Sequence, residues 1–211
     1  MAVNAAIAIV IAYLLGSIPF AYIAGRLFKG VDIRQVGGGN IGALNTAREI
    51  GLVPGLLVLI ADAGKGSLAV LVALWLDVPL ILVFGAGLAA VVGHNWPVFL
   101  KFKGGKGAAT TIGVLLALAP LETAISIALT VVLIVITSNV RLAVVIGLMV
   151  LPVIIWQMNG SWMLIVYSIA IFLFLCVRAM PSIIAAMTHI GDRKKLIIDR
   201  EYHLWQARKS K

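Results

Sequence analysis

The residues best suited to chemistry lie in one polar, basic segment between two long apolar runs. The segment begins at Gly93 with the sequence GHNWPVFLKFKGGKGAAT. In its Gly-Gly-Lys-Gly run the backbone can adopt positive φ and approach a ligand closely, so that successive N–H groups converge on an anion. The apolar residues that follow predict a helix, whose positive end would face the same point. We therefore expect a phosphate-sized site made of Gly104, Gly105, Gly107 and the charge of Lys106, with an ordinary basic loop as the alternative.

A second glycine-rich segment, GGGNIGALNTAR, ends at Arg48. The guanidinium of Arg48 suits a phosphate through its fork of donors, and the amides of Asn40 and Asn45 suit hydroxyl or ester oxygens. The alternative is a flexible amphipathic loop. If both segments share one side of the protein, they form a site for one or two ligands that carry phosphate.

Asp62 and Lys65 lie three residues apart in an apolar run that predicts a helix. They share a face and can pair. An ionisable residue inside a membrane span is costly and is by default a functional hypothesis, although the pair could serve packing alone. His94 is the only histidine beside the basic segment and is either a base, a hydrogen-bond donor or a structural residue. Neither a catalytic triad nor metal-ligand spacing is evident, so we expect no protein nucleophile, metal or cofactor.

The composition excludes a soluble globular domain. Of the 211 residues, 62% are hydrophobic and 12% are charged, whereas soluble domains are about one quarter charged. We therefore expect an all-α, polytopic membrane protein that forms a single domain over residues 1–211. The net charge of +9 is confined to a few segments, which favours membrane orientation and anionic lipid or substrates over nucleic acid.

Positive charge decides the expected number of spans. Pro120 suits the first turn of a helix, and Glu122 near that start is favoured by the helix dipole. Splitting the run there places every Lys- or Arg-containing connection, 26–52, 94–107, 138–141 and 178 onward, on one face. The sequence therefore predicts seven spans with the N-terminus outside and the C-terminus inside, the short fourth one being alternatively re-entrant. The expected spans are 2–23, 53–76, 80–92, about 107–118, about 120–137, 140–157 and 161–177.

On these segments the chain resembles the PlsY-type family of bacterial acyl-phosphate:glycerol-3-phosphate acyltransferases over nearly its whole length. GGGNIGALNTAR is similar to that family's first motif. The sequence DAGKG, which begins at Asp62, is similar to the short Asp-x-x-Lys-Gly element of the family's second span. GHNWPVFLKFKGGKGAAT is similar to the second motif. Gly38 stands where the first motif usually has Ser. In the third motif His189 fits, whereas Asp192 replaces Asn and Lys195 replaces Arg.

The resemblance implies transfer of a fatty acyl group from acyl phosphate to the 1-hydroxyl of glycerol 3-phosphate. The products are lysophosphatidic acid and phosphate, in phospholipid biosynthesis. It also implies a bacterial cytoplasmic membrane protein whose active site faces the cytoplasm, with an upstream enzyme that produces acyl phosphate as a further partner. A transporter of a phosphorylated metabolite, with Asp62 and Lys65 in its path, and a non-catalytic relative are the alternatives. Lys106 and His94 are expected to support catalysis.

The residues expected to bind substrate are Gly38, Gly39, Asn40, Gly42, Asn45, Arg48, Asp62, Lys65, Asn95, Gly104, Gly105, Lys106, Gly107, Thr110 and His189.

Overall fold

The computed structural model describes residues 2–189, with side chains up to Pro181 and that of Ile184. Within this part of the chain all regular secondary structure is helical, which confirms the predicted class. In chain order the elements are α1 (Ala2–Ser17), α2 (Phe20–Lys29), η1 (Ile33–Gln35), α3 (Ala43–Glu49), α4 (Leu52–Trp75), α5 (Leu80–Asn95), η2 (Val98–Leu100), α6 (Ala108–Leu118), α7 (Pro120–Thr137), α8 (Val140–Met158) and α9 (Trp162–His189). The chain separates into two compact units, Met1–Pro120 and Leu121–Lys211.

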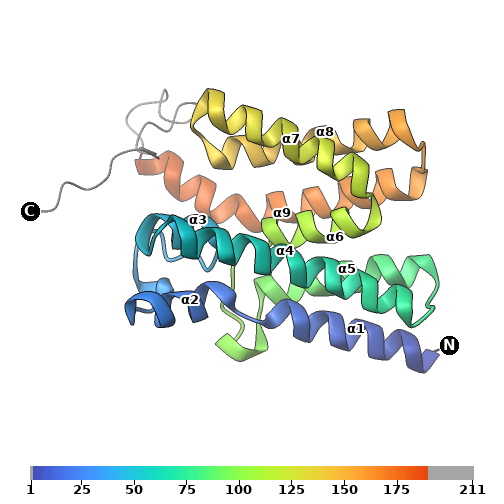
Figure 1. Cartoon of the computed structure of the whole chain (residues 1–211), viewed down its shortest axis with the longest axis horizontal. Coiled ribbons are helices and arrows are strands. Elements are labelled where there is room, and N and C mark those ends of the chain that lie inside the picture. Colours follow the sequence, from blue (N-terminus) through green and yellow to red (C-terminus); the bar gives the residue numbers. More distant parts are fainter. Residues whose placement is uncertain (1, 190–211) are drawn as a thin grey trace, which may run out of the picture. The chain divides into compact units, whose positions relative to one another are not determined.

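The first unit is built around α4, which packs against α1, α3, α5 and α6 (Figure 1). Glycines allow the closest crossings. A Cβ atom on Gly16 of α1 would clash with the carbonyl of Ala90 on α5, and one on Gly113 of α6 would clash with the carbonyl of Ala63 on α4. Small residues at such crossings let helix backbones approach within a membrane, where packing must replace the hydrophobic effect.

The first expected span, 2–23, is interrupted in the structure. Helix α1 ends at Ser17 and α2 begins at Phe20, because Pro19 has no N–H to donate and crowds the residue before it. The carbonyl of Ile18, in the break between the two helices, accepts a hydrogen bond from Nζ of Lys65 at 2.8 Å and one from the N–H of Phe20 at 3.2 Å. Helix α2 then continues into the segment expected to be a loop and ends at Lys29, with Gly30 as its C-cap at a φ of 67°.

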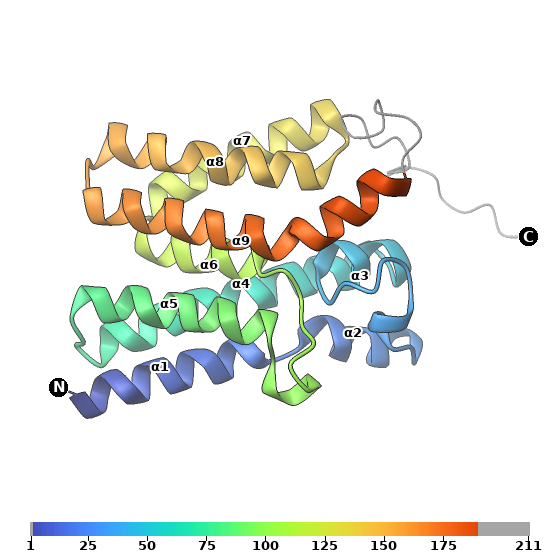
Figure 2. The ribbon, with the colours of Figure 1, turned by 180° about the vertical axis from the view of Figure 1, so that it is seen from behind.

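The second unit holds α7, α8 and α9, and Figure 2 shows α8 and α9 side by side. The predicted start at Pro120 is confirmed, since α7 begins there. The hydroxyl of Ser126 on α7 donates to the carbonyl of Gly147 on α8 at 2.8 Å. Helix α9 extends to His189, well beyond the predicted end at residue 177.

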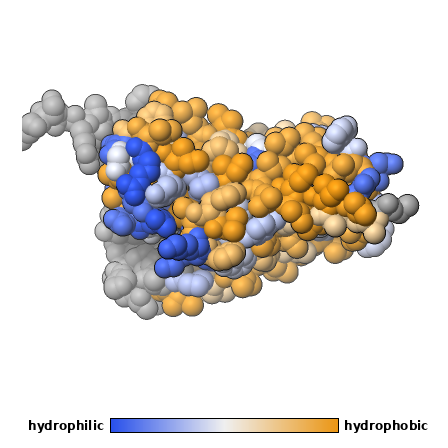
Figure 3. All heavy atoms as spheres, turned by 90° about the horizontal axis from the view of Figure 1, so that it is seen from below, coloured by the Kyte–Doolittle hydropathy of each residue, from blue (hydrophilic) through white to orange (hydrophobic). Residues whose placement is uncertain are grey.

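Within the described residues, six helical segments are long and apolar enough to cross a membrane, and α6 is a shorter apolar helix. About seven spans, the fourth of them short, are therefore confirmed. Figure 3 shows a broad hydrophobic surface on the face of the first unit that carries α1, with hydrophilic side chains gathered mostly at the end that carries α2. The orientation of the termini and the single domain over 1–211 stay predictions.

Candidate active site

The basic segment is shorter as a loop than the sequence predicted. Helix α5 continues through His94 and Asn95, so the loop itself runs from 96 to 107 and contains η2. Its glycine pair folds back onto the end of α5, where the N–H of Gly105 donates to the carbonyl of His94 at 3.1 Å. A Cβ atom on Gly104 would clash with that same carbonyl, and one on Gly105 would clash with Nε2 of His94 and the carbonyl of Ile41. Close packing therefore requires glycine at both positions.

Gly107 supplies the positive φ that the sequence predicted for this run. Its φ is 86° and it is the N-cap of α6. The carbonyl of Gly107 accepts the N–H of Thr111 at 2.8 Å and so starts the helix. Lys106 is half-buried between Gly105 and Gly107, which are both buried. The four residues from Gly104 to Gly107, called here the glycine cradle, thus lead directly into the N-terminal end of an apolar helix.

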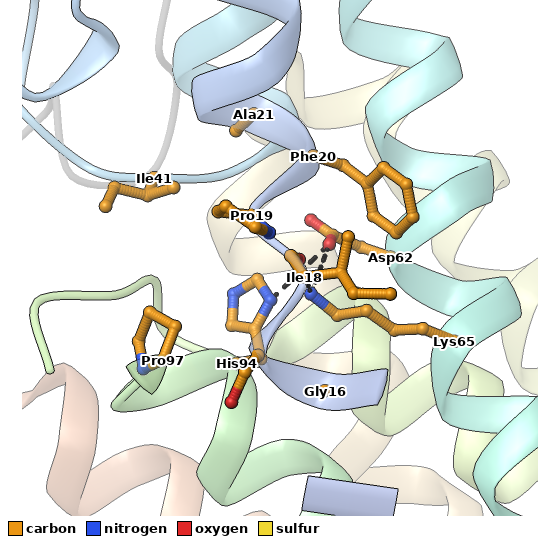
Figure 4. Close-up of a pocket in the computed structure, with 11 residues that line it drawn as sticks. Gly16, Ile18, Pro19, Phe20, Ala21, Ile41, Asp62, Lys65, His94 and Pro97 are labelled. Atoms are coloured by element: carbon orange, nitrogen blue, oxygen red, sulfur yellow. Dashed lines mark hydrogen bonds and ion pairs between the residues drawn. The ribbon is translucent and has the colours of Figure 1, made fainter. Parts of the chain in front are cut away.

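Behind the cradle lies a buried ionic cluster of Asp62 and Lys65 from α4 and His94 from α5 (Figure 4). Nζ of Lys65 lies 2.7 Å from Oδ1 of Asp62, and Nδ1 of His94 lies 3.5 Å from the same oxygen. The three side chains are between 2% and 7% exposed. They line a narrow pocket together with Pro19, Ile41 and Pro97. The predicted pairing of Asp62 with Lys65 is confirmed, and the contact with His94 is additional.

The glycine-rich segment that ends at Arg48 comes first in the chain and is called here the first loop. It is held by the side chain of Asn45 on α3. Its Oδ1 accepts the N–H of Gly38 at 3.1 Å, while its Nδ2 donates to the carbonyls of Ile33 at 3.3 Å and Val36 at 3.2 Å. The amide that the sequence offered to a substrate is thus engaged with the loop backbone. The short helix α3, absent from the sequence prediction, carries Arg48 on its exposed side.

Sequence reasoning missed a second support of this loop, formed by Asp32 and Arg34. The carboxylate of Asp32 accepts Nε of Arg34 at 2.9 Å and Nη2 at 2.6 Å, and Nη2 of Arg26 lies 3.8 Å away. The guanidinium groups of Arg26 and Arg34 both lie over the ring of Tyr22. The hydrogen bonds from Arg34 lower the pKa of Asp32 to about 2. Asp32 also accepts the N–H of Arg34 at 3.0 Å. Asp often closes a turn in this way by bonding the backbone two residues on, and that preference could have revealed the support.

The structure brings the two loops together at Gly105, which packs against the carbonyl of Ile41. Two further predicted site residues are buried near the cradle: Asn95, whose carbonyl lies against Gly104, and Thr110, three residues after Gly107. Asn95 is 0% exposed, and neither polar atom of its side chain has a hydrogen-bond partner. The hydroxyl of Thr110 is also buried and also has no hydrogen-bond partner. The side chain of His189 lies outside those described, as do Asp192 and Lys195.

Comparison with known proteins identifies the chain. A family model described as glycerol-3-phosphate acyltransferase matches residues 6–197. Glycerol-3-phosphate acyltransferase 1 of Dehalococcoides mccartyi is 40% identical over 90% of this chain and 95% of its own, and the glycerol-3-phosphate acyltransferase of Desulforamulus reducens is 37% identical over 93% and 94%. Glycerol-3-phosphate acyltransferase 2 of Moorella thermoacetica is 44% identical over 77% and 83%.

Two solved structures also match. They are crystal structures of PlsY (YgiH), an integral membrane glycerol 3-phosphate acyltransferase, in its glycerol 3-phosphate form and its lysophosphatidic acid form. The first gives a TM-score of 0.79 at 33% identity and the second 0.78 at 32%, each covering 87% of this chain and 92% of the solved one. Because the matches extend over nearly all of the chain, this integral, multi-pass membrane protein is an acyltransferase and belongs to the PlsY-type glycerol-3-phosphate acyltransferase family.

Proposed function

We propose that the protein transfers a fatty acyl group from acyl phosphate to the 1-hydroxyl of glycerol 3-phosphate and releases lysophosphatidic acid and phosphate. The observation that carries the proposal is the meeting of two glycine-rich loops at Gly105 and Ile41, one of which leads into the N-terminus of α6. The solved relatives in glycerol 3-phosphate and lysophosphatidic acid forms support the acceptor and the product.

The glycine cradle is the proposed site of the donor's phosphate. Backbone N–H groups at the start of a helix attract an anion, and the ammonium of Lys106 adds a full charge. Acyl phosphate is an activated mixed anhydride, so the acceptor hydroxyl can attack the acyl carbon directly. The new ester C–O bond forms, the C–O bond to phosphate breaks, and the departing phosphate takes the hydroxyl proton. No protein nucleophile is needed, since alignment can supply about 7–11 kcal/mol at best and stabilisation of the oxyanion adds to it.

The first loop is the proposed site of glycerol 3-phosphate. Arg48 lies on the exposed side of α3, where its fork of donors suits the acceptor's phosphate. The amide of Asn40 and the backbone of Gly38, Gly39 and Gly42 are the remaining candidates on this loop. Asn45 positions them, because its own amide is engaged with the loop backbone.

The ionic cluster supports the cradle rather than the substrate. Asp62 faces Nδ1 of His94, which leaves Nε2 of that ring beside Gly105, and the His94 carbonyl holds the Gly105 N–H. Burial and mutual pairing of Asp62 and Lys65 therefore favour a positioning role over substrate contact. The same narrow, paired arrangement disfavours a path for a transported metabolite.

We place this site on the cytoplasmic face of a bacterial inner membrane, because the basic connections gather on one face. The donor's acyl chain would lie among the helices in the inner leaflet. An enzyme that produces acyl phosphate would supply the donor.

The test uses detergent-purified protein with acyl phosphate, in the presence and absence of glycerol 3-phosphate. Phosphate release and lysophosphatidic acid are both measured, the latter by mass spectrometry. We expect both to appear only when donor and acceptor are present. Replacement of acyl phosphate by an acyl thioester should give no product, and product from the thioester alone would overturn the donor assignment.

Lys106→Ala should raise the KM for acyl phosphate more than tenfold, since a charge-assisted contact contributes about 1.5–3 kcal/mol. Lys106→Arg keeps the charge, so its KM for acyl phosphate should lie between those of Lys106→Ala and the wild type. Unchanged kinetics of Lys106→Ala would remove Lys106 from the donor site.

A further inference from the structure

The turn from Val98 to Lys103, called here the aromatic turn, places apolar and cationic side chains outward. Val98, Phe99 and Phe102 are 42%, 60% and 57% exposed. Lys101 and Lys103 between and after them are also exposed. The apolar segment that contains α5 and could cross the membrane runs to Leu100, so Val98 and Phe99 lie at its end, whereas Phe102 lies beyond it between Lys101 and Lys103.

The backbone holds the turn in this arrangement. The carbonyl of Pro97 accepts the N–H of Leu100 at 3.1 Å and that of Phe102 at 2.9 Å. Lys101 and Phe102 have φ of 53° and 60°, a region that bulky residues rarely occupy and that marks functional turns. Leu100 points the other way and is buried in a cluster with Ile33 and Ile41. One side of the turn is thus anchored in the core while its aromatic side chains face outward.

The aromatic residues next to the turn indicate that it lies at the level of the bilayer surface. It follows α5, which ends at Asn95, and Trp96 there is 38% exposed. The hydroxyl of Tyr13 on α1 donates to the carbonyl of Trp96 at 2.9 Å. Aromatic residues at helix ends mark the level of the lipid headgroups. Phe99 also lines an open apolar groove with α1, and the other lining residues are Ile11, Leu14, Leu15 and Ile18.

We propose that the aromatic turn binds an anionic phospholipid of the bilayer. An acyl chain of that lipid lies in the groove beside Phe99, and its phosphate is met by Lys101 and Lys103. Charge complementarity supports this occupant, since each basic residue near a membrane surface favours anionic lipid. Lys103 directly precedes Gly104, so binding of the headgroup fixes the start of the glycine cradle. Anionic lipid thereby raises the activity of the enzyme.

Spin-label depth measurements test the position of the turn independently of activity. Phe102→Cys is made in a Cys176→Ala background, because Cys176 is the single cysteine of the chain. Ile7→Cys, on an exposed part of α1 outside the groove, serves as the hydrocarbon control, and Gln35→Cys, exposed in η1, serves as the water control. In vesicles we expect the label at 102 to show a collision ratio between the two controls. A label at 102 as accessible to a water-soluble relaxation agent as that at 35 would overturn the proposal.

Activity in vesicles tests the lipid itself. Wild type is compared in phosphatidylcholine alone and in phosphatidylcholine with phosphatidylglycerol, and we expect a rise of about threefold or more with the anionic lipid. Lys101→Gln with Lys103→Gln should lose this rise, while Arg141→Gln, which removes an exposed charge at the start of α8, should keep it. A wild type that does not respond, or a double variant that responds fully, would contradict the proposal. If the double variant raises the KM for acyl phosphate equally in both vesicle types, the two lysines bind the donor and not a lipid, and the proposal is overturned.

Discussion

The two glycine-rich loops use glycine for different physical reasons. In the cradle, Gly104 and Gly105 are required because a Cβ atom would clash with the end of α5. In the first loop, Gly37 and Gly39 are required because their φ values are 58° and 66°. Gly38 meets neither condition, since its Cβ would find no atom within 4 Å. Close packing is therefore the constraint on the Gly104–Gly105 pair, whereas positive φ is the constraint shared by Gly37 and Gly39 in the first loop and by Gly107 at the end of the cradle.

The supports of the two loops differ in burial as well. The cradle rests against the ionic cluster, in which Lys65 and Asp62 are 3% and 2% exposed. The first loop rests on Asn45 and on the pair of Asp32 with Arg34, whose side chain is 35% exposed. Interactions shielded from water cost more to break than exposed ones. We therefore expect larger effects from substitutions behind the cradle than from those behind the first loop.

The largest effect should come from Gly105→Ala. The added methyl group clashes with the His94 ring and with the carbonyl of Ile41, so the cradle must move. A shift of about 1 Å in a site that works by alignment can cost about 100-fold in activity. The matched control is Gly38→Ala, which has space and no positive φ and should raise the free energy of unfolding by about 0.4–1 kcal/mol. Thermal unfolding and steady-state kinetics check both, and equal activity losses would refute the contrast.

Breaking the ionic cluster should rank next. Lys65→Met leaves the carboxylate of Asp62 buried beside His94 alone, and loss of one partner from a buried pair costs about 3–5 kcal/mol. Adding Asp62→Asn should recover part of this loss, since no buried charge is then left unpaired. Exposed Lys101→Met is the control and should change the unfolding free energy by less than about 0.5 kcal/mol. Thermal unfolding in detergent measures all of these, and a double variant as unstable as the sum of the singles would argue against the pairing.

Asn45→Ala should have an intermediate effect, confined to the first loop. It removes three hydrogen bonds to Gly38, Ile33 and Val36, and unsatisfied buried groups cost about 1–3 kcal/mol. The KM for glycerol 3-phosphate should rise about tenfold or more, whereas that for acyl phosphate changes little. Thr46→Val on the same helix serves as the control, because its hydroxyl donates to the carbonyl of the N-cap residue Gly42, which keeps the N–H of Thr46 as a partner. A parallel rise in both KM values would show that the two loops move together.

Local chemistry allowed several features to be predicted from the sequence. The dipole argument at Pro120 located the start of α7, and the three-residue spacing predicted the ion pair of Asp62 with Lys65. The break after Ser17 was missed because both flanking segments are apolar, although Pro19 was visible. The short helices of the first loop were missed because their stability comes from tertiary packing rather than from propensity.

The contact of His94 with Asp62 joins α5 to α4, and no local spacing encodes such a meeting. The same holds for the packing of Gly105 against Ile41, which joins the two loops. Composition and spacing therefore indicated which residues could act, whereas the tertiary structure shows which of them support the others.

The smallest expected effect is the pH dependence of stability that comes from the pair of Asp32 with Arg34, the more exposed support of the first loop. Because hydrogen bonds from Arg34 lower the pKa of Asp32 to about 2 in the folded protein, the ionised carboxylate stabilises the fold above its unfolded pKa of about 4. This contribution is lost as the pH falls from about 4 through about 2. Asp32→Asn should therefore lower the thermal midpoint at pH 6, and the gap from wild type should narrow below about pH 4. Gln35→Ala, exposed in η1, is the control and should show no such narrowing. A gap that stays constant to acid pH would mean that the pair with Arg34 contributes no pH-dependent stability, and the first loop would then rest on Asn45.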